Sequence, residues 1–199
     1  MPVSVVSICN LALSHVGAYS IGAIDERSME ARVCMQHYDT CRDETLRSFP
    51  WAFATKTVPL ALASGVSYPN WEYAYALPAD CLRAIRLVYE GMDLHPEEEE
   101  PFTLMSGATG TTTYLLADLE QAWLEYTAKA LDPTVYDSQF VTALSYRLAS
   151  AIATALSAND SKRRELMQFF QLAVQEAKTS SANEGNKDNK INRYVRSRG

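Results

Sequence analysis

The spacing of apolar residues changes twice along this chain of 199 residues. Apolar residues recur every three or four positions before residue 50, every second position in much of the segment 51–131, and every three or four positions again in residues 132–180. A spacing of three to four residues is typical of amphipathic helices, and a spacing of two is typical of half-buried strands. The sequence therefore predicts an α+β protein in which a β unit is inserted between two pairs of helices.

Two N-terminal helices are predicted by this periodicity and by signals at their ends. The first covers residues 4–15 and ends at Gly17, a residue type that commonly follows the last helical turn. The second begins at the polar cluster 25–28 and ends before Pro50, which cannot continue a helix. Its inner face is expected to contain Ala31, Cys34, Tyr38, Cys41 and Thr45.

Residues 51–131 are predicted to form a mainly antiparallel β unit of five or six strands. Trp71–Leu77 alternates aromatic with small or charged residues, and prolines and glycines divide the rest into short segments. These segments are 55–62, 82–89, 102–105, 112–117 and 122–129. Large aromatic residues are expected to fill the core of this unit, with part of the set available for interfaces. They are Trp51, Trp71, Tyr73, Tyr75, Tyr89, Tyr114, Trp123 and Tyr126.

The segment 132–180 predicts the second helix pair. Asp132-Pro133 is typical of a helix entry, and Asn159-Asp160-Ser161 offers a cap for the last helix. Two terminal helix pairs unite most simply into one body. The predicted fold is therefore an antiparallel four-helix bundle, formed by residues 1–50 and 132–180, with the β unit 51–131 inserted.

The C-terminal segment 181–199 is predicted to be a flexible basic tail, because residues beyond Thr179 are too polar to pack. From Lys178 onward the chain carries six basic and two acidic residues, so this end is +4 within a net charge of −6. Apolar groups among these cations are typical of a peptide that orders on a partner, and an unordered solubilising tail is the alternative. The predicted docking residues are Lys190, Ile191, Asn192, Arg193, Tyr194, Val195, Arg196 and Arg198.

The charge of the remaining body, −10, limits its partners. An acidic surface repels nucleic-acid phosphates, so a DNA-coating role is not expected. No apolar run approaches the ~20 residues of a membrane-spanning helix, and the first residues lack the basic and apolar regions of a signal peptide. Folding in the cytoplasm, without membrane association and with reduced cysteines, is therefore expected.

Three residues of the second predicted helix have the chemistry of metal ligands. Cys34, His37 and Cys41 share one helix face, and thiolate and imidazole are good zinc ligands. A structural zinc site also needs ligands from a second segment, and no matching Cys/His pair occurs elsewhere. We therefore predict a small-residue core face and neither a metal nor a cofactor.

A run of four glutamates is flanked by Pro96 and Pro101. Acid and base catalysis needs carboxylates held in distinct environments, which adjacent residues of one loop do not provide. The run is predicted to be a solvated loop, with a channel lining or a surface for a basic partner as the alternative. It consists of Glu97, Glu98, Glu99 and Glu100. No catalytic residue is predicted, and the protein is not expected to be an enzyme.

Several stretches share their order and spacing with one known family. They are Ile8-Cys9-Asn10-Leu11-Ala12-Leu13-Ser14-His15-Val16-Gly17-Ala18, Glu30-Ala31-Arg32, Tyr38-Asp39, Arg42-Asp43-Glu44-Thr45-Leu46, Pro50-Trp51-Ala52-Phe53-Ala54 and Tyr75-Ala76-Leu77-Pro78-Ala79-Asp80-Cys81-Leu82-Arg83. Together they resemble the tail tubular protein A family of podophages, and the similarity continues more loosely through the last two predicted helices. The glutamate run has no counterpart in the family pattern.

This resemblance implies a structural virion protein, the head-to-tail adaptor of a short-tailed phage. It implies a dodecameric ring beneath the portal protein, with the tail nozzle attached below and DNA passing through without sequence-specific binding. The segment 186–199 would then contact the portal, and the β unit would face neighbouring subunits or the nozzle. Assembly would take place in the host cytoplasm.

Two other functions remain open from the residues alone. One is a virion-associated hydrolase of the cell wall or a surface glycan, with Glu or Asp side chains as acid and base. The other is a connector or completion protein of another phage tail type, which would also bind near the portal.

Overall fold

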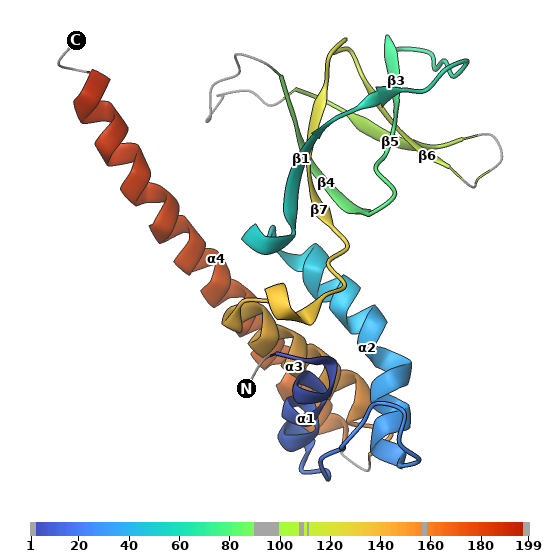
Figure 1. The fold of residues 1–199 in the computed structure, drawn as a ribbon, viewed down its shortest axis with the longest axis vertical. Coiled ribbons are helices and arrows are strands. Elements are labelled where there is room, and N and C mark those ends of the chain that lie inside the picture. The colour runs from blue at the N-terminus through green and yellow to red at the C-terminus, as the bar shows by residue number, and fades with distance from the viewer. Residues whose placement is uncertain (1–2, 90–99, 108–109, 111, 157–158, 197–199) are drawn as a thin grey trace. The chain divides into compact units, whose positions relative to one another are not determined.

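The computed structural model describes residues 3–89, 100–107, 110, 112–156 and 159–196, with side chains up to Ala182. The described chain contains four α-helices and seven β-strands (Figure 1). It divides into a helical unit, Met1–Phe49 with Leu131–Gly199, and a β unit, Pro50–Ala130.

The helices are α1 (Val5–Val16), α2 (Met29–Ser48), α3 (Ser138–Ile152) and α4 (Asp160–Arg196). Side chains cap the first three helices, because Ser4, Ser28 and Asp137 each accept a hydrogen bond from a backbone N–H of the first turn. α1 ends at Gly17, whose φ of 73° lies in the left-handed region that glycine adopts without strain. None of the described helices is long and apolar enough to cross a membrane.

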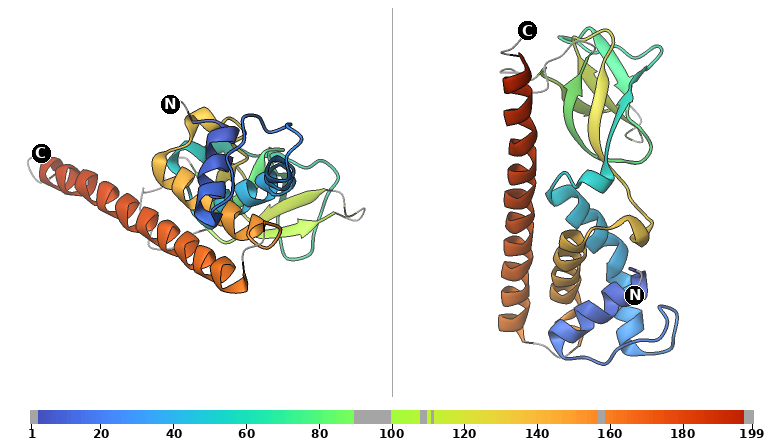
Figure 2. Two further views of the ribbon diagram at one scale, coloured as in Figure 1. Left: turned by 90° about the horizontal axis from the view of Figure 1, so that it is seen from below. Right: turned by 60° about the vertical axis from the view of Figure 1, so that its left-hand side comes forward.

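α3 is the central helix of the helical unit and contacts α1, α2 and α4 (Figure 2). α1 contacts α3 far more extensively than it contacts α2, and α4 packs mainly on α3. Beyond its first turn, α3 is therefore enclosed by other helices and buries small, apolar and hydroxyl side chains alike. The buried residues are Phe140, Ala143, Leu144, Ser145, Leu148, Ala149, Ser150 and Ile152.

The predicted antiparallel four-helix bundle is wrong. The structure is α+β and its antiparallel strands lie between the helices in the chain, but the N- and C-terminal helix pairs do not unite into one bundle. The physical reason is the uneven distribution of helix contacts, since three helices share α3 as their main partner. On α4, consequently, Leu172 is not covered by another helix and is 58% exposed.

The β unit consists of two antiparallel sheets. The three-stranded sheet has the order β1 (Thr55–Pro59), β7 (Trp123–Ala128), β4 (Cys81–Val88). The four-stranded sheet has the order β2 (Ala61–Leu62), β3 (Tyr73–Ala76), β6 (Thr113–Ala117), β5 (Thr103–Ser106). β1 and β2 are separated by Leu60 alone, so one nearly continuous segment contributes to both sheets.

Both sheets contribute to a single core in the β unit. The buried cluster consists of Tyr75, Leu87, Leu115, Ala117, Ala122, Leu124, Tyr126 and Ala128. The Tyr75 hydroxyl donates to the carbonyls of Leu119 and Glu120, so this buried phenol has its polar end satisfied. Of the aromatic residues expected in the core, Trp51 is buried as well, whereas Tyr89 and Trp123 are exposed.

The turn between β3 and β4 is fixed by Asp80. Its carboxylate accepts hydrogen bonds from Lys56 Nζ at 2.7 Å and from the Tyr126 hydroxyl at 2.9 Å. The hydrogen bond from Lys56 is the main reason that the pKa of Asp80 lies below its usual range. Burial of the Tyr126 hydroxyl and, to a smaller extent, its hydrogen bond to Asp80 raise the pKa of Tyr126 to about 12. Asp80 therefore joins β1 and β7 through their side chains.

α4 continues as a helix to Arg196, whereas the sequence analysis expected no regular structure beyond Thr179. The segment contains no proline, and Gly185 is its only glycine, so no residue stops a helix that packing on α3 has started. Ala177 is the last buried residue among those of α4 whose side chains are described.

The enclosure of α3 predicts an asymmetric response to added volume. Ala149 is fully buried, so Ala149→Leu should lower the free energy of unfolding by about 1–3 kcal/mol through overpacking. Ala155 is exposed just after α3, and Ala155→Leu should change this free energy by less than about 0.5 kcal/mol. Urea unfolding followed by circular dichroism measures both, and equal effects would contradict the enclosed position of α3.

Candidate interaction site

Most of the side chains predicted to meet partners lie outside the described residues. Glu97, Glu98 and Glu99 are among these, and Glu100 is exposed immediately before Pro101. The docking residues Lys190 to Arg196 belong to α4, but their side chains are not described, and Arg198 lies beyond the described chain. Both predictions therefore stay predictions.

The Cys34, His37 and Cys41 face of α2 points into the helical core. Both cysteines are buried, and His37 is half-buried. Cys34 lies beside Cys9 of α1. The hydrogen bond with the Cys34 thiol and, second, burial raise the pKa of Cys9. Among the described residues, no three His, Cys, Asp or Glu side chains form a group that could hold a metal ion.

An arginine on α2 is buried and forms ion pairs with two carboxylates nearer the surface. Arg42 is 4% exposed, and its guanidinium donates to Asp39 and Asp43 at 2.7 Å each. A buried guanidinium is tolerated only when carboxylates compensate its charge, so these ion pairs fix the side chain in place. A second ion pair, between Glu44 and Arg147, joins α2 to α3.

His15 joins α1 to α3 through a stacked ring contact. Its ring lies 4.5 Å from the Tyr146 ring at an interplanar angle of 20°, and its Nε2 is 3.1 Å from the Ser145 hydroxyl. Tyr146 also contacts Phe169 of α4 at 5.5 Å. Burial, together with the nearby positive charge of Lys162, lowers the pKa of His15.

This lowered pKa makes stability depend on pH. The folded state favours neutral His15, so the unfolded state binds more protons once the pH falls below the ordinary histidine value of 6.5. The free energy of unfolding that neutral His15 contributes is fully present well above pH 6.5 and is lost progressively as the pH falls below this value. His15→Gln, which cannot titrate, should lose less unfolding free energy than the wild type between pH 7.5 and pH 5.5 in urea titrations. Equal losses would contradict the proposed burial of a neutral imidazole.

The segment between α1 and α2, residues 17–28, is held by hydrogen bonds at two points, and we name it the anchored loop. At the first point, the Asn10 side chain pairs with the backbone of Ile21: Asn10 Nδ2 donates to the carbonyl at 2.9 Å, and the Ile21 N–H donates to Asn10 Oδ1 at 2.7 Å. The Ile21 side chain is buried. This loop therefore has one hydrophobic and one hydrogen-bonded attachment to the helical unit.

Glu26 provides the second anchor. Its carboxylate accepts hydrogen bonds from the N–H groups of Gly22 and Ala23 and from the Ser28 hydroxyl. These donors, led by Ser28, hold the pKa of Glu26 below its usual range. Ser28 in turn caps α2. The C-terminal end of the anchored loop is therefore held by hydrogen bonds up to the first turn of α2.

Tyr19 is presented to solvent by the anchored loop. Its side chain is 85% exposed, the highest value among the large apolar or aromatic residues that the structure describes as exposed. An exposed tyrosine on a loop that is already ordered loses little entropy on binding and offers both contact area and a hydroxyl. Sequence reasoning missed this site, since only the polar Asn10 among the apolar residues Ile8 to Leu13 hinted at a fixed loop.

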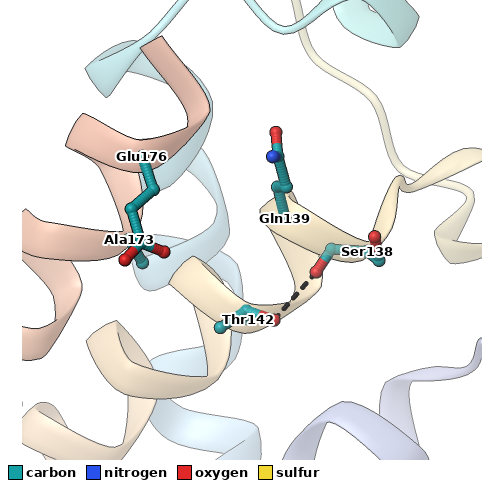
Figure 3. A pocket seen from close by; sticks show the side chains of 5 residues that line it. All are labelled: Ser138, Gln139, Thr142, Ala173 and Glu176. Carbon is teal, nitrogen blue, oxygen red and sulfur yellow. Dashed lines mark hydrogen bonds between the residues drawn. The ribbon is translucent and has the colours of Figure 1, made fainter. Parts of the chain in front are cut away.

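A shallow pocket of about 130 Å³ lies between α3 and α4 (Figure 3). It is lined by Ser138, Gln139, Thr142, Ala173 and Glu176. The Thr142 hydroxyl donates to the Ser138 carbonyl at 2.9 Å, so this donor is already used within α3. The remaining polar side-chain groups are the Ser138 hydroxyl, the Gln139 amide and the Glu176 carboxylate, which can form hydrogen bonds with a partner.

A scan against protein-family models and a search of curated proteins found no match for this chain.

Proposed function

We propose that this protein is a structural component of a short-tailed phage virion, the head-to-tail adaptor that self-associates into a ring between the portal protein and the tail nozzle. The observation that carries the proposal is the ordered series of stretches, from Ile8 to Arg83, that resemble the tail tubular protein A family. The ring is proposed to be dodecameric, as the family resemblance implies.

The positions of the matching residues support this proposal. Gly17 ends α1 in the left-handed conformation, Arg42 is the buried cation of α2, and Trp51 and Tyr75 are fully buried. Asp80 fixes the turn between β3 and β4. The resemblance therefore includes residues that fix helices, strands and a turn in both units.

Charge and surface support it as well. The body of the chain is strongly acidic, which suits a conduit whose wall must not retain phosphate groups. The anchored loop offers an ordered, exposed tyrosine for a neighbouring subunit, and contacts between unlike surfaces close into rings when the rotation permits. The basic residues of α4 beyond Lys178 provide an oppositely charged end for a partner.

Purified protein mixed with the portal protein of the same virus tests the adaptor role directly. We expect a complex that migrates with the portal in size-exclusion chromatography and shows an added ring in electron micrographs. A chain truncated after Ser180 should lose portal binding while keeping the thermal unfolding transition of the helical unit, and its circular dichroism should lose only the helical signal of residues 181–196. If the complete chain fails to bind the portal, the adaptor proposal is wrong; if the truncated chain still binds, the portal contact lies outside residues 181–199.

Ring formation should depend on Tyr19. Tyr19→Ala removes an exposed side chain and should leave the unfolding curve unchanged, but it should weaken subunit association on the portal by at least about tenfold. Met35→Ala, at a residue of α2 that is 64% exposed, is the control and should titrate like the wild type. Titration of each variant against a fixed amount of portal measures the effect, and identical titrations would remove Tyr19 from the interface.

A further inference from the structure

Among the described strands, β5 lies at an edge of the four-stranded sheet and pairs with β6 alone. All four of its residues are exposed, including Leu104 at 46% and Met105 at 43%. Edge strands present unpaired backbone groups to other chains, and proteins commonly protect them with charges, prolines or bulges.

The edges of the other sheet carry such protection. β4 has register irregularities between Cys81 and Arg83 and between Ala84 and Arg86, so two bulges and two arginines interrupt this edge. β1 contains Lys56 and Pro59. β5 keeps a regular register with β6 and contains neither a charged residue nor a proline. β2, the other edge of the same sheet, has only two residues. Among the described edges, β5 is thus the one that combines several residues with the absence of charges, prolines and bulges.

The backbone direction of β5 can be derived from its hairpin with β6. The Gly107 N–H donates to the Thr112 carbonyl at 2.7 Å, and the register continues with Ser106 opposite Thr113. Bonded and non-bonded pairs alternate in an antiparallel ladder, so Leu104 and Ser106 direct their N–H and carbonyl groups away from β6. The Tyr68 hydroxyl donates to this outward carbonyl of Ser106 at 3.2 Å.

We propose that β5 pairs with β5 of a second copy of this chain, in an antiparallel and two-fold symmetric arrangement. Because the outward groups belong to even-numbered residues, the symmetric register places Leu104 opposite Leu104 of the second copy and Phe102 opposite Ser106 of the second copy. Each Leu104 N–H then donates to the Leu104 carbonyl of the other copy. The two four-stranded sheets become one sheet of about eight strands.

The side chains favour a second copy as the occupant. Leu104 lies opposite the buried Leu115 and Phe102 packs against the core cluster, so pairing extends the apolar core across the symmetry axis. An uncharged strand brings no like charges together when it meets itself. The basic C-terminal segment of this chain, by contrast, carries charges that an uncharged apolar edge cannot compensate. The contact does not depend on the proposed adaptor role.

Sedimentation velocity of the complete chain, from low to high micromolar concentration, tests the proposal. We expect dimers to accumulate with concentration and Leu104→Lys to weaken association by at least about tenfold, because it buries two like charges at the axis. Leu62→Lys, at a residue of β2 that is 56% exposed, is the matched control and should dimerise like the wild type. Both variants should keep the wild-type circular dichroism.

Cross-linking tests the register independently. The proposed pairing brings Thr103 of one copy next to Met105 of the other as a non-bonded pair, with Cα atoms roughly 4.5 Å apart, a separation that a disulfide can span. Thr103→Cys with Met105→Cys, in a Cys81→Ser background, should form dimers under copper phenanthroline oxidation. A wild type that stays monomeric at every concentration overturns the proposal, as does a dimer that survives Leu104→Lys. Neither result decides whether the chain binds the portal, which the mixing experiment tests separately.

Discussion

The enclosure of α3 is the constraint on which the helical unit depends. A helix that other helices surround must fit each of its neighbours at once, and α3 does so with small alanines and serines that let neighbours approach and larger leucines that fill the space between helices. His15, Tyr146 and Phe169 then connect α1, α3 and α4 through ring contacts, while Glu44 and Arg147 connect α2 to α3. Loss of α3 would therefore leave the other three helices without a common partner.

The β unit interrupts the chain between α2 and α3, and it maintains a core of its own. Residues far apart in its sequence, such as Lys56, Asp80 and Tyr126, meet through their side chains within this unit. The two proposed contact surfaces belong to different units, the anchored loop to the helical unit and the β5 edge to the β unit.

Local signals predicted the elements well, and tertiary pairing escaped them. The predicted starts and stops at Ser28, Gly17 and Pro50 correspond to caps and ends of helices, and each predicted strand segment contains a strand within one or two residues. Periodicity indicates that a helix has an apolar face but not which other helix packs against that face. The predicted four-helix bundle was wrong for this reason. The pairing of Asn10 with Ile21 spans eleven positions and has no periodic signature, which is why the anchored loop was missed. The extension of α4 depends on the absence of a stop signal, and polarity alone predicted disorder there.

Native-state hydrogen exchange of the complete chain tests the central role of α3 most directly. If α3 organises the helical unit, amides in its enclosed part, residues 143–152, should exchange only through global unfolding, with the largest protection in this unit. Amides of α1, α2 and α4 should exchange no more slowly, and those of α4 beyond Ala177 should exchange fastest, because no described side chain there is buried. Exchange of α3 at lower free energy than α1 or α2 would show that those helices stay folded without it, and would contradict this account.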